Sequence, residues 1–163
     1  MNNSFVEQLL NSCATELDHV KTLVTAHGVA SAISPYLTKY AIIRACGVIE
    51  QSFKTIIADY CSSRSKKQIK RYVNLKVREA SSNPSYETIC RYLKDFDEDW
   101  NLLFKDRING DVNKAQILSS LTSLVEARND FAHGGSPGSS INDIYNYFVH
   151  ARQIIEHMDQ VVC

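Results

Sequence analysis

Apolar residues recur roughly every three or four positions through almost the whole chain, and this pattern limits the fold more than any other feature. Only three prolines and six glycines interrupt the 163 residues, which is few for a chain of this length. No segment alternates apolar and polar residues with the period of two that a half-buried strand would show. The sequence therefore predicts an all-α fold, an antiparallel bundle of long helices joined by short loops.

Start and stop signals divide this pattern into helices. Ser4 and Glu7 form a capping box at the start of the first helix, which ends at Gly28. Ser34, followed by a proline at the first helical position, opens a long second helix that runs to about Cys61. The later elements expected are a basic helix over 64–78, a short helix after Pro84 through Phe96, an acidic stretch followed by a turn at 109–111, a helix over 113–132 and a last helix from Ser140 to the C-terminus.

These helices are expected to form one domain. A chain of 163 residues can bury roughly 70% of its unfolded surface in one core. We expect a single domain over 1–163, whose core lies within 34–162 and receives the first helix, 4–27, on its surface.

The charge balance and the cysteines exclude several classes of protein. Eighteen basic and eighteen acidic residues give zero net charge, so no overall field draws the chain to nucleic acid or to an anionic membrane. The five cysteines are widely spaced and include no CxxC pair, which favours reduced thiols and no structural metal or cofactor. There is no signal-peptide pattern and no run of eighteen apolar residues. We therefore expect a soluble, cytoplasmic protein without membrane contact.

The segment VEARNDFAHGGSPGSS, residues 125–140, carries the strongest functional signal. It places Arg128, Asn129 and His133 at the end of the 113–132 helix, before a loop rich in glycine and serine. One interpretation is purely structural, because the negative end of a helix favours cations and a Gly-Gly pair is a common helix stop. The other is a functional site, because imidazole and guanidinium groups suit acid–base chemistry at a phosphate.

The surroundings favour a functional site. LVEARNDFAHGG lies on the penultimate helix of a small bundle and is followed by a loop and one amphipathic helix. This arrangement resembles the HEPN family, in particular its RiboL-PSP-type and related stand-alone members. The long helix adds a second likeness, since Arg44 and Glu50 interrupt the apolar face of YAIIRACGVIEQSFKTII. The resemblance covers about residues 34–162.

The resemblance implies metal-independent RNA cleavage by a homodimer, with one composite site where the helix ends of two chains meet. RNA supplies its own nucleophile, the 2′-hydroxyl, so the protein must supply a base, an acid and charge stabilisation. His133 would act as base in one chain and as acid in the other, Arg128 would hold the non-bridging oxygens, and Asn129 would orient the phosphate or the imidazole. A prokaryotic defence or stress role is also implied, with an antitoxin or defence-system protein as a further candidate partner.

On a regular helix, Arg128 and His133 point in different directions. Five residues at about 100° each leave them about 140° apart. They converge if the helix unwinds near Ala132, which Gly134 and Gly135 would make easy, or if one of them reaches the partner chain. HEPN toxins that pair with nucleotidyltransferase antitoxins usually carry a tyrosine two positions after the histidine. Gly135 occupies that position here, which argues against this type of pairing.

Glu50 and Arg44 on the long helix are assigned supporting roles at the motif, and the basic helix is assigned a role in RNA binding. Glu50 is expected to orient Arg128 through a cross-helix contact, or else to pair with Arg44, because an unpaired buried carboxylate is costly. The basic helix offers cations that would steer RNA to the site, although an ordinary solvated helix face explains them equally well. The RNA-binding candidates are Lys66, Lys67, Lys70 and Arg71, and Tyr72 on the same helix is a candidate for stacking on a base.

Other features have simpler explanations. The acidic stretch DFDEDW has carboxylates for a metal site but no histidine nearby, so a surface loop or helix cap is favoured. His150 and His157 lie seven residues apart on one helix face, which is more typical of a polar stripe or an interface than of a ligand set. The leading alternative to a nuclease is a non-catalytic HEPN-like module that binds RNA or a protein. A nucleotide-binding regulator is a third hypothesis.

Overall fold

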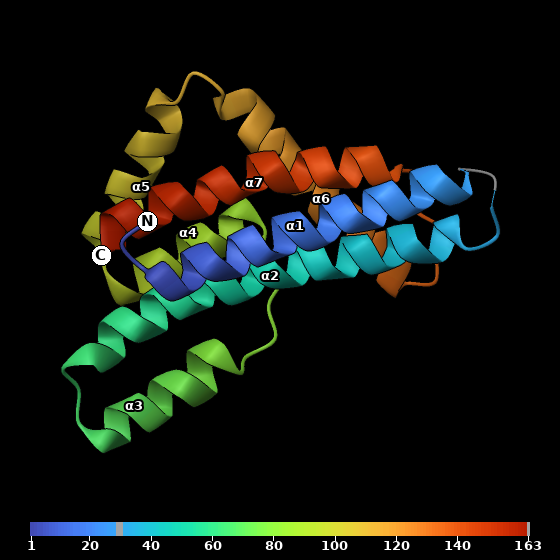
Figure 1. The fold of residues 1–163 in the computed structure, drawn as a ribbon. Helices are drawn as coiled ribbons and strands as arrows, with labels where there is room; N and C mark the ends of the chain where they lie inside the picture. The colour runs from blue at the N-terminus through green and yellow to red at the C-terminus, as the bar shows by residue number, and fades with distance from the viewer. Residues whose placement is uncertain (29–30, 163) are drawn as a thin grey trace.

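The computed structural model describes residues 1–28 and 31–162, and within them its regular elements are all helical (Figure 1). The all-α prediction is confirmed for these residues. In chain order the elements are α1 (Ser4–His27), α2 (Ser34–Ser63), α3 (Lys67–Val73), the π-helical turn η1 (Asn74–Arg78), α4 (Tyr86–Phe96), α5 (Glu98–Gly110), α6 (Lys114–Ala132) and α7 (Ile141–Val162).

The second helix, α2, is the central helix of the bundle. It packs against α1, α6 and α7, and the long helices α1, α2 and α7 lie side by side (Figure 1). Its buried residues are not confined to one stripe, since Val48 and Ile49 are neighbours in sequence and both are fully buried. A helix that is buried on more than one face needs partners on several sides. Large buried side chains from three helices fill the core, among them Phe53, Phe104 and Phe148.

The first helix has an N-cap that lies one residue before the predicted one. Its N-cap is Asn3, whose Oδ1 accepts a hydrogen bond from Val6 N at 3.1 Å, so the expected Ser4 capping box is wrong. Asn3 is also held from outside the helix, because its N–H donates to Asp159 Oδ1 on α7 at 2.9 Å. The buried stripe therefore starts at Val6, whereas Phe5, the first apolar residue of the helix, is 54% exposed.

Two other boundary signals are confirmed. Ser140 N donates to Asp143 Oδ2 at 2.8 Å and Asp143 N donates to Ser140 Oγ at 3.2 Å, which is the expected capping box of α7. Gly28, the expected end of α1, has a φ of +84°.

The helix α5 was not predicted as a helix. Asp97 is its N-cap, and its Oδ1 accepts from Asp99 N at 2.8 Å and from Trp100 N at 3.3 Å. The acidic stretch is thus a helix cap, one of its two favoured interpretations, at an end where carboxylates are stabilising. The three adjacent apolar residues at 102–104 obscure the helical period in the sequence. Only the last of them, Phe104, is buried.

The basic segment forms an arm that projects beside the C-terminal end of α2 (Figure 1). It is α-helical as α3 and then widens into η1, where Glu79 N donates to Asn74 O at 3.0 Å, five residues back. Its inward face is small, since Val73 and Val77 are buried but Ile69, one turn before Val73, is 51% exposed. We call α3 and η1 together the basic arm.

The cysteines of the described residues are free thiols, as expected: Cys13, Cys46, Cys61 and Cys90. Cys163 lies outside the described residues. No helix within 1–28 and 31–162 combines the length and the apolar character needed to cross a membrane.

Candidate functional site

The helix α6 remains regular to its end, where the exposed His133 is the C-cap. Gly134 N donates to Phe131 O at 3.0 Å and Gly135 N donates to Asp130 O at 2.8 Å, the paired bonds of a Schellman motif. Gly134 provides the positive φ that this motif requires, +85°. The helix does not unwind before His133, so the first of the two expected routes to convergence is not used in this chain.

The second glycine of the turn lies against the exposed side chain of Asp130. A Cβ atom placed on Gly135 would lie 2.1 Å from Asp130 Oδ1, well inside contact distance. A larger side chain at this position would have to displace the Asp130 carboxylate.

The side chain of Asn129 is held by two donors. Its Oδ1 accepts from Arg128 Nη1 at 3.2 Å and from Asn83 Nδ2 at 3.2 Å. Asn83 belongs to the segment between η1 and α4, which therefore touches α6 at the motif. Asn83 directly precedes the helix-breaking Pro84, and no local pattern marks its contact with a residue 46 positions away.

Arg128 is a half-buried cation that has no carboxylate partner among the described residues. The other half-buried arginines each form an ion pair: Arg44 with Glu16, Arg78 with Asp59 and Arg152 with Glu156. The guanidinium of Arg128 donates only to the amide of Asn129 within the same residues. Its remaining N–H groups are therefore available to bind an anion through two parallel hydrogen bonds.

Glu50 pairs with neither Arg128 nor Arg44, so that prediction is wrong. Its Oε1 accepts from Lys54 Nζ, one turn further along α2, and from Ser82 N at 3.0 Å. Lys54 is buried and also donates to a backbone carbonyl in the segment that contains Ser82. The four-residue spacing on one helix face made Lys54 the nearer partner.

Arg128 and Glu50 nevertheless share a neighbourhood around the buried thiol of Cys46. Burial raises the pKa of Cys46 to about 12, while the charge of Arg128 opposes this shift and that of Glu50 adds to it. The thiol is therefore protonated near neutrality and is not a nucleophile. The site thus groups Arg128 and Asn129 with Asn83 and Glu50, and it leaves the histidine of the motif at the open helix end.

Comparison with known proteins identifies the family of this chain. A family model described as RiboL-PSP-HEPN matches residues 7–163. The chain belongs to the RiboL-PSP-HEPN family. The match begins within α1, a helix that the sequence resemblance did not cover. No curated protein and no solved structure matches the chain. The HEPN family includes ribonucleases, so the function class indicated is RNA cleavage or RNA binding.

In this RiboL-PSP-HEPN chain, Arg44 joins α1 to α2 and makes no contact with the motif. Its Nε donates to Glu16 Oε2 at 2.8 Å, and the hydroxyl of Tyr40 donates to the same carboxylate. Desolvation disfavours the charged form of Glu16, but the hydrogen bonds from Tyr40 and Arg44 outweigh it and lower the pKa of Glu16 below its ordinary value. The supporting role predicted for Arg44 therefore has no structural basis within the described residues.

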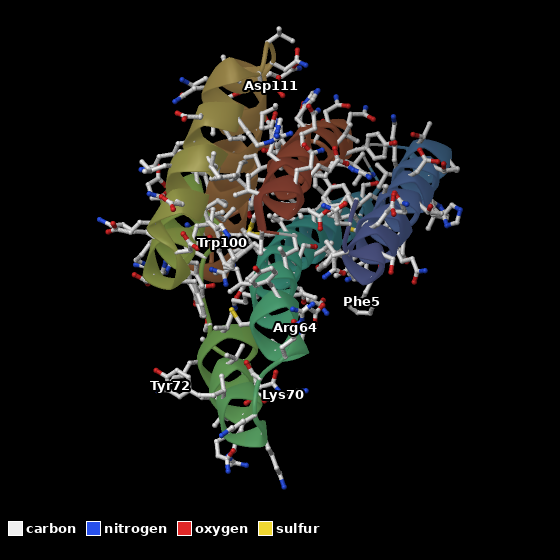
Figure 2. The ribbon with its side chains drawn as sticks, turned by 90° about the vertical axis from the view of Figure 1, so that its left-hand side faces the viewer. Phe5, Arg64, Lys70, Tyr72, Trp100 and Asp111 are labelled. Atoms are coloured by element: carbon white, nitrogen blue, oxygen red, sulfur yellow. The ribbon has the colours of Figure 1, made fainter. Side chains whose placement is uncertain are left out.

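The predicted RNA-binding residues of the RiboL-PSP-HEPN chain lie on the basic arm or directly before it. All are exposed, and none forms an ion pair within the described residues: Lys66, Lys67, Lys70 and Arg71. Figure 2 shows Lys70 and Tyr72 on opposite sides of α3. Lys70 therefore points away from the ring of Tyr72.

The acidic and histidine-bearing segments have structural roles. In the part of the chain that the structure describes, no three His, Cys, Asp or Glu side chains gather closely enough to hold a metal ion. His157 Nε2 lies 2.8 Å from Asp111 Oδ2, and His150 Nδ1 lies 3.3 Å from Ser120 Oγ. The two histidines therefore have separate partners, as a polar stripe would.

Proposed function

We propose that this chain is a metal-independent endoribonuclease of the HEPN type that acts as a homodimer. The observation that carries the proposal is the half-buried Arg128 without a carboxylate partner among the described residues, fixed beside Asn129 and close in sequence to the exposed His133. These groups are suited to hold a phosphate and to move protons near neutral pH. Membership of a family that includes ribonucleases supports the same activity.

The proposed reaction begins with attack of the RNA 2′-hydroxyl on the adjacent phosphorus, while its proton passes to the imidazole of His133. The bond between phosphorus and the 5′-oxygen then breaks, and the partner's His133, in its protonated form, gives that oxygen a proton. The products are a 2′,3′-cyclic phosphate end and a 5′-hydroxyl end. Arg128 stabilises the charge that develops on the non-bridging oxygens, and Asn129 orients the phosphate.

The separation of Arg128 and His133 along α6 supports a site shared by two chains. Because α6 is regular to its end, these side chains point about 140° apart in one chain. A twofold axis near the end of α6 would place His133 opposite the partner's Arg128.

The test is incubation of the purified protein with mixed RNA, with and without EDTA, followed by analysis of the RNA ends. We expect 2′,3′-cyclic phosphate ends in both conditions, and their loss in Arg128→Ala and His133→Ala variants that keep the helical circular-dichroism spectrum. His19→Ala changes an exposed histidine on α1 and should cleave like the wild type. Cleavage that requires a metal, or that survives both motif substitutions, would contradict the proposal.

A second function is a non-catalytic module that binds RNA or a partner protein. It follows if no second chain brings His133 and Arg128 together, because these side chains point in different directions within one chain. In the same assay it predicts RNA binding without new RNA ends.

We also propose a prokaryotic role in defence or stress, in which a second protein restrains the nuclease. Expression of the wild type should then slow bacterial growth, whereas the His133→Ala variant should not. Equal growth with both chains would contradict this role.

A further inference from the structure

One surface hollow lies between the basic arm and α4, and a second lies between the C-terminal end of α2 and the start of α5. The Phe96 side chain lines both of them. One has a volume of about 420 Å³ and the other of about 560 Å³. Because they share this wall, we treat them as one groove. We name it the aromatic groove after the rings that line it: Tyr60, Tyr72, Tyr92, Phe96 and Trp100.

Several rings of the aromatic groove are open to solvent. Tyr72 is 62% exposed, Tyr60 is 52% exposed and Phe96 is 40% exposed. Tyr60 and Trp100 form an edge-to-face pair with ring centroids 5.0 Å apart. Figure 2 shows Trp100 and Tyr72 on the same side of the molecule, on either side of the junction between arm and bundle. Exposed rings offer flat surfaces on which nucleic-acid bases stack.

The charges that line the groove favour an anionic ligand. Arg64, Lys76 and Arg91 are exposed, and their side chains form no ion pair or hydrogen bond within the described residues. Two carboxylates also line the groove, Asp95 and Asp97, but Asp97 caps α5 through Oδ1. The groove therefore has more free cations than free carboxylates. The lysines and the arginine predicted to bind RNA lie on the same arm or directly before it, and Lys70 lies on the side of α3 opposite Tyr72.

We propose that the aromatic groove binds single-stranded RNA, with bases stacked on its rings and phosphates held by Arg64, Lys76 and Arg91. The inference rests on the proposed nuclease function, to which the groove adds substrate binding away from the cleavage site. Stacking accepts every base, so the groove selects unpaired strands rather than a sequence. A duplex does not fit this mode, because its bases are already stacked on one another.

The groove and the motif lie on different parts of the molecule. Tyr60 follows Glu50 by ten residues on α2, which corresponds to about 15 Å along the helix axis. Glu50 and Arg128 share the neighbourhood of Cys46. An RNA strand therefore occupies both places only if it is several nucleotides long, and a dinucleotide at the motif leaves the groove empty.

The test uses the full chain with the His133→Ala substitution, which leaves RNA uncut, and a single-stranded RNA of about fifteen nucleotides. Trp100 is the only tryptophan, so its fluorescence reports binding in the groove directly. We expect the RNA to quench this fluorescence, and Tyr72→Ala and Phe96→Ala each to weaken binding about tenfold. Tyr72→Phe keeps the ring and should bind like the parent. Tyr36→Ala removes a tyrosine that is 72% exposed but lies at the other end of α2, and it is the matched control.

Unchanged affinity in Tyr72→Ala and Phe96→Ala, or RNA binding without a change in Trp100 fluorescence, would overturn the inference. The inference would also fail if Tyr72→Ala and Phe96→Ala changed the oligomeric state of the protein but left its RNA affinity unchanged. The groove would then be a contact between protein chains. In chains that keep His133, substitutions in the groove should slow cleavage of the fifteen-nucleotide RNA but not of a dinucleotide. Equal effects on the two substrates would also overturn the inference. A chain that binds RNA through the groove but cuts none supports the groove and contradicts the nuclease proposal alone.

Discussion

Gly134 holds the end of α6 in a conformation that other residues rarely adopt. Its φ of +85° lies in the left-handed region, directly after the exposed His133. Gly134→Ala is expected to lower the free energy of unfolding by about 1 kcal/mol, measured by urea denaturation. Gly138→Ala is the matched control, because an added Cβ meets nothing within 4 Å and the φ there is not positive. Equal losses in both variants would contradict the role assigned to the turn.

The ion pair of half-buried Glu50 and buried Lys54 has a structural role that can be separated from catalysis. Glu50→Gln keeps an acceptor for Ser82 N but leaves the buried ammonium of Lys54 without a carboxylate, which is expected to cost about 3 kcal/mol of stability. Adding Lys54→Met removes the stranded charge and should recover part of that loss, again measured by urea denaturation. If Glu50 only supports the fold, RNA cleavage recovers with stability in the double variant. Cleavage that stays lost in a stable double variant would instead place Glu50 in the reaction.

The sequence identified the motif residues but not their neighbours. Arg128 and His133 stand out because their types and spacing carry chemical meaning without knowledge of the fold. The partner of Glu50 was visible as well, because Lys54 follows it by one helical turn, although an arginine was expected instead. The contact of Asn83 with Asn129 depends on where the segment before α4 crosses α6, and no local pattern encodes that crossing.

The contact between α1 and α2 should depend on pH through Glu16. Its pKa is lowered in the folded chain, so the carboxylate adds stability above the ordinary glutamate value of 4.5, and this stability is lost as the pH falls through the folded-state pKa. We expect wild type to exceed Glu16→Gln in urea midpoint at pH 7, and the difference to shrink at about pH 3. Asp106→Asn changes an exposed carboxylate on α5 and is the control. A difference that stays constant with pH would rule out an ionic contribution from Glu16.

The basic arm is expected to set the salt dependence of RNA binding. Neutralising Lys66, Lys67, Lys70 and Arg71 together should weaken binding and reduce the slope of log K against log salt concentration by about 3, because each contact to a single strand contributes about 0.7. Fluorescence titrations of the His133→Ala chain at several salt concentrations measure the slope. Replacing the exposed Lys94 and Lys105 on α4 and α5 by alanine is the control. An unchanged slope would show that these cations are only a solvated face.

Elements were predictable where a helical period and a capping residue coincided. The last helix, α7, shows both, and its capping box is confirmed. The run at 102–104 masked α5, because three adjacent apolar residues show no period. The π-helical turn η1 carries no signal in the sequence, since its wider spacing is associated with packing onto α2, where Arg78 pairs with Asp59.

At the scale of the whole molecule, the bundle follows from periodicity, whereas the assembly does not. Long helices with apolar stripes and short connections have few ways to bury those stripes other than side by side. A contact between two copies is made by surface residues whose pattern resembles that of any solvated face. The composite site therefore stays a prediction. It states that one reaction requires two histidines, His133 of one chain and the partner's His133.

Mixing active and inactive chains measures that number. If each site needs His133 and the partner's His133, a dimer of one wild-type and one His133→Ala chain is inactive. When equal amounts are co-refolded so that subunits assort randomly, about one quarter of the dimers are fully wild type, and the rate per total protein should fall to about one quarter of that of pure wild type. A chain that acts alone would give about one half, because every wild-type copy would keep its activity. Mixing with His19→Ala, which keeps the motif, should leave the rate unchanged and controls for refolding. A rate near one half would exclude the shared site. The motif could still be catalytic in that case, because each chain would then contribute a complete site of its own.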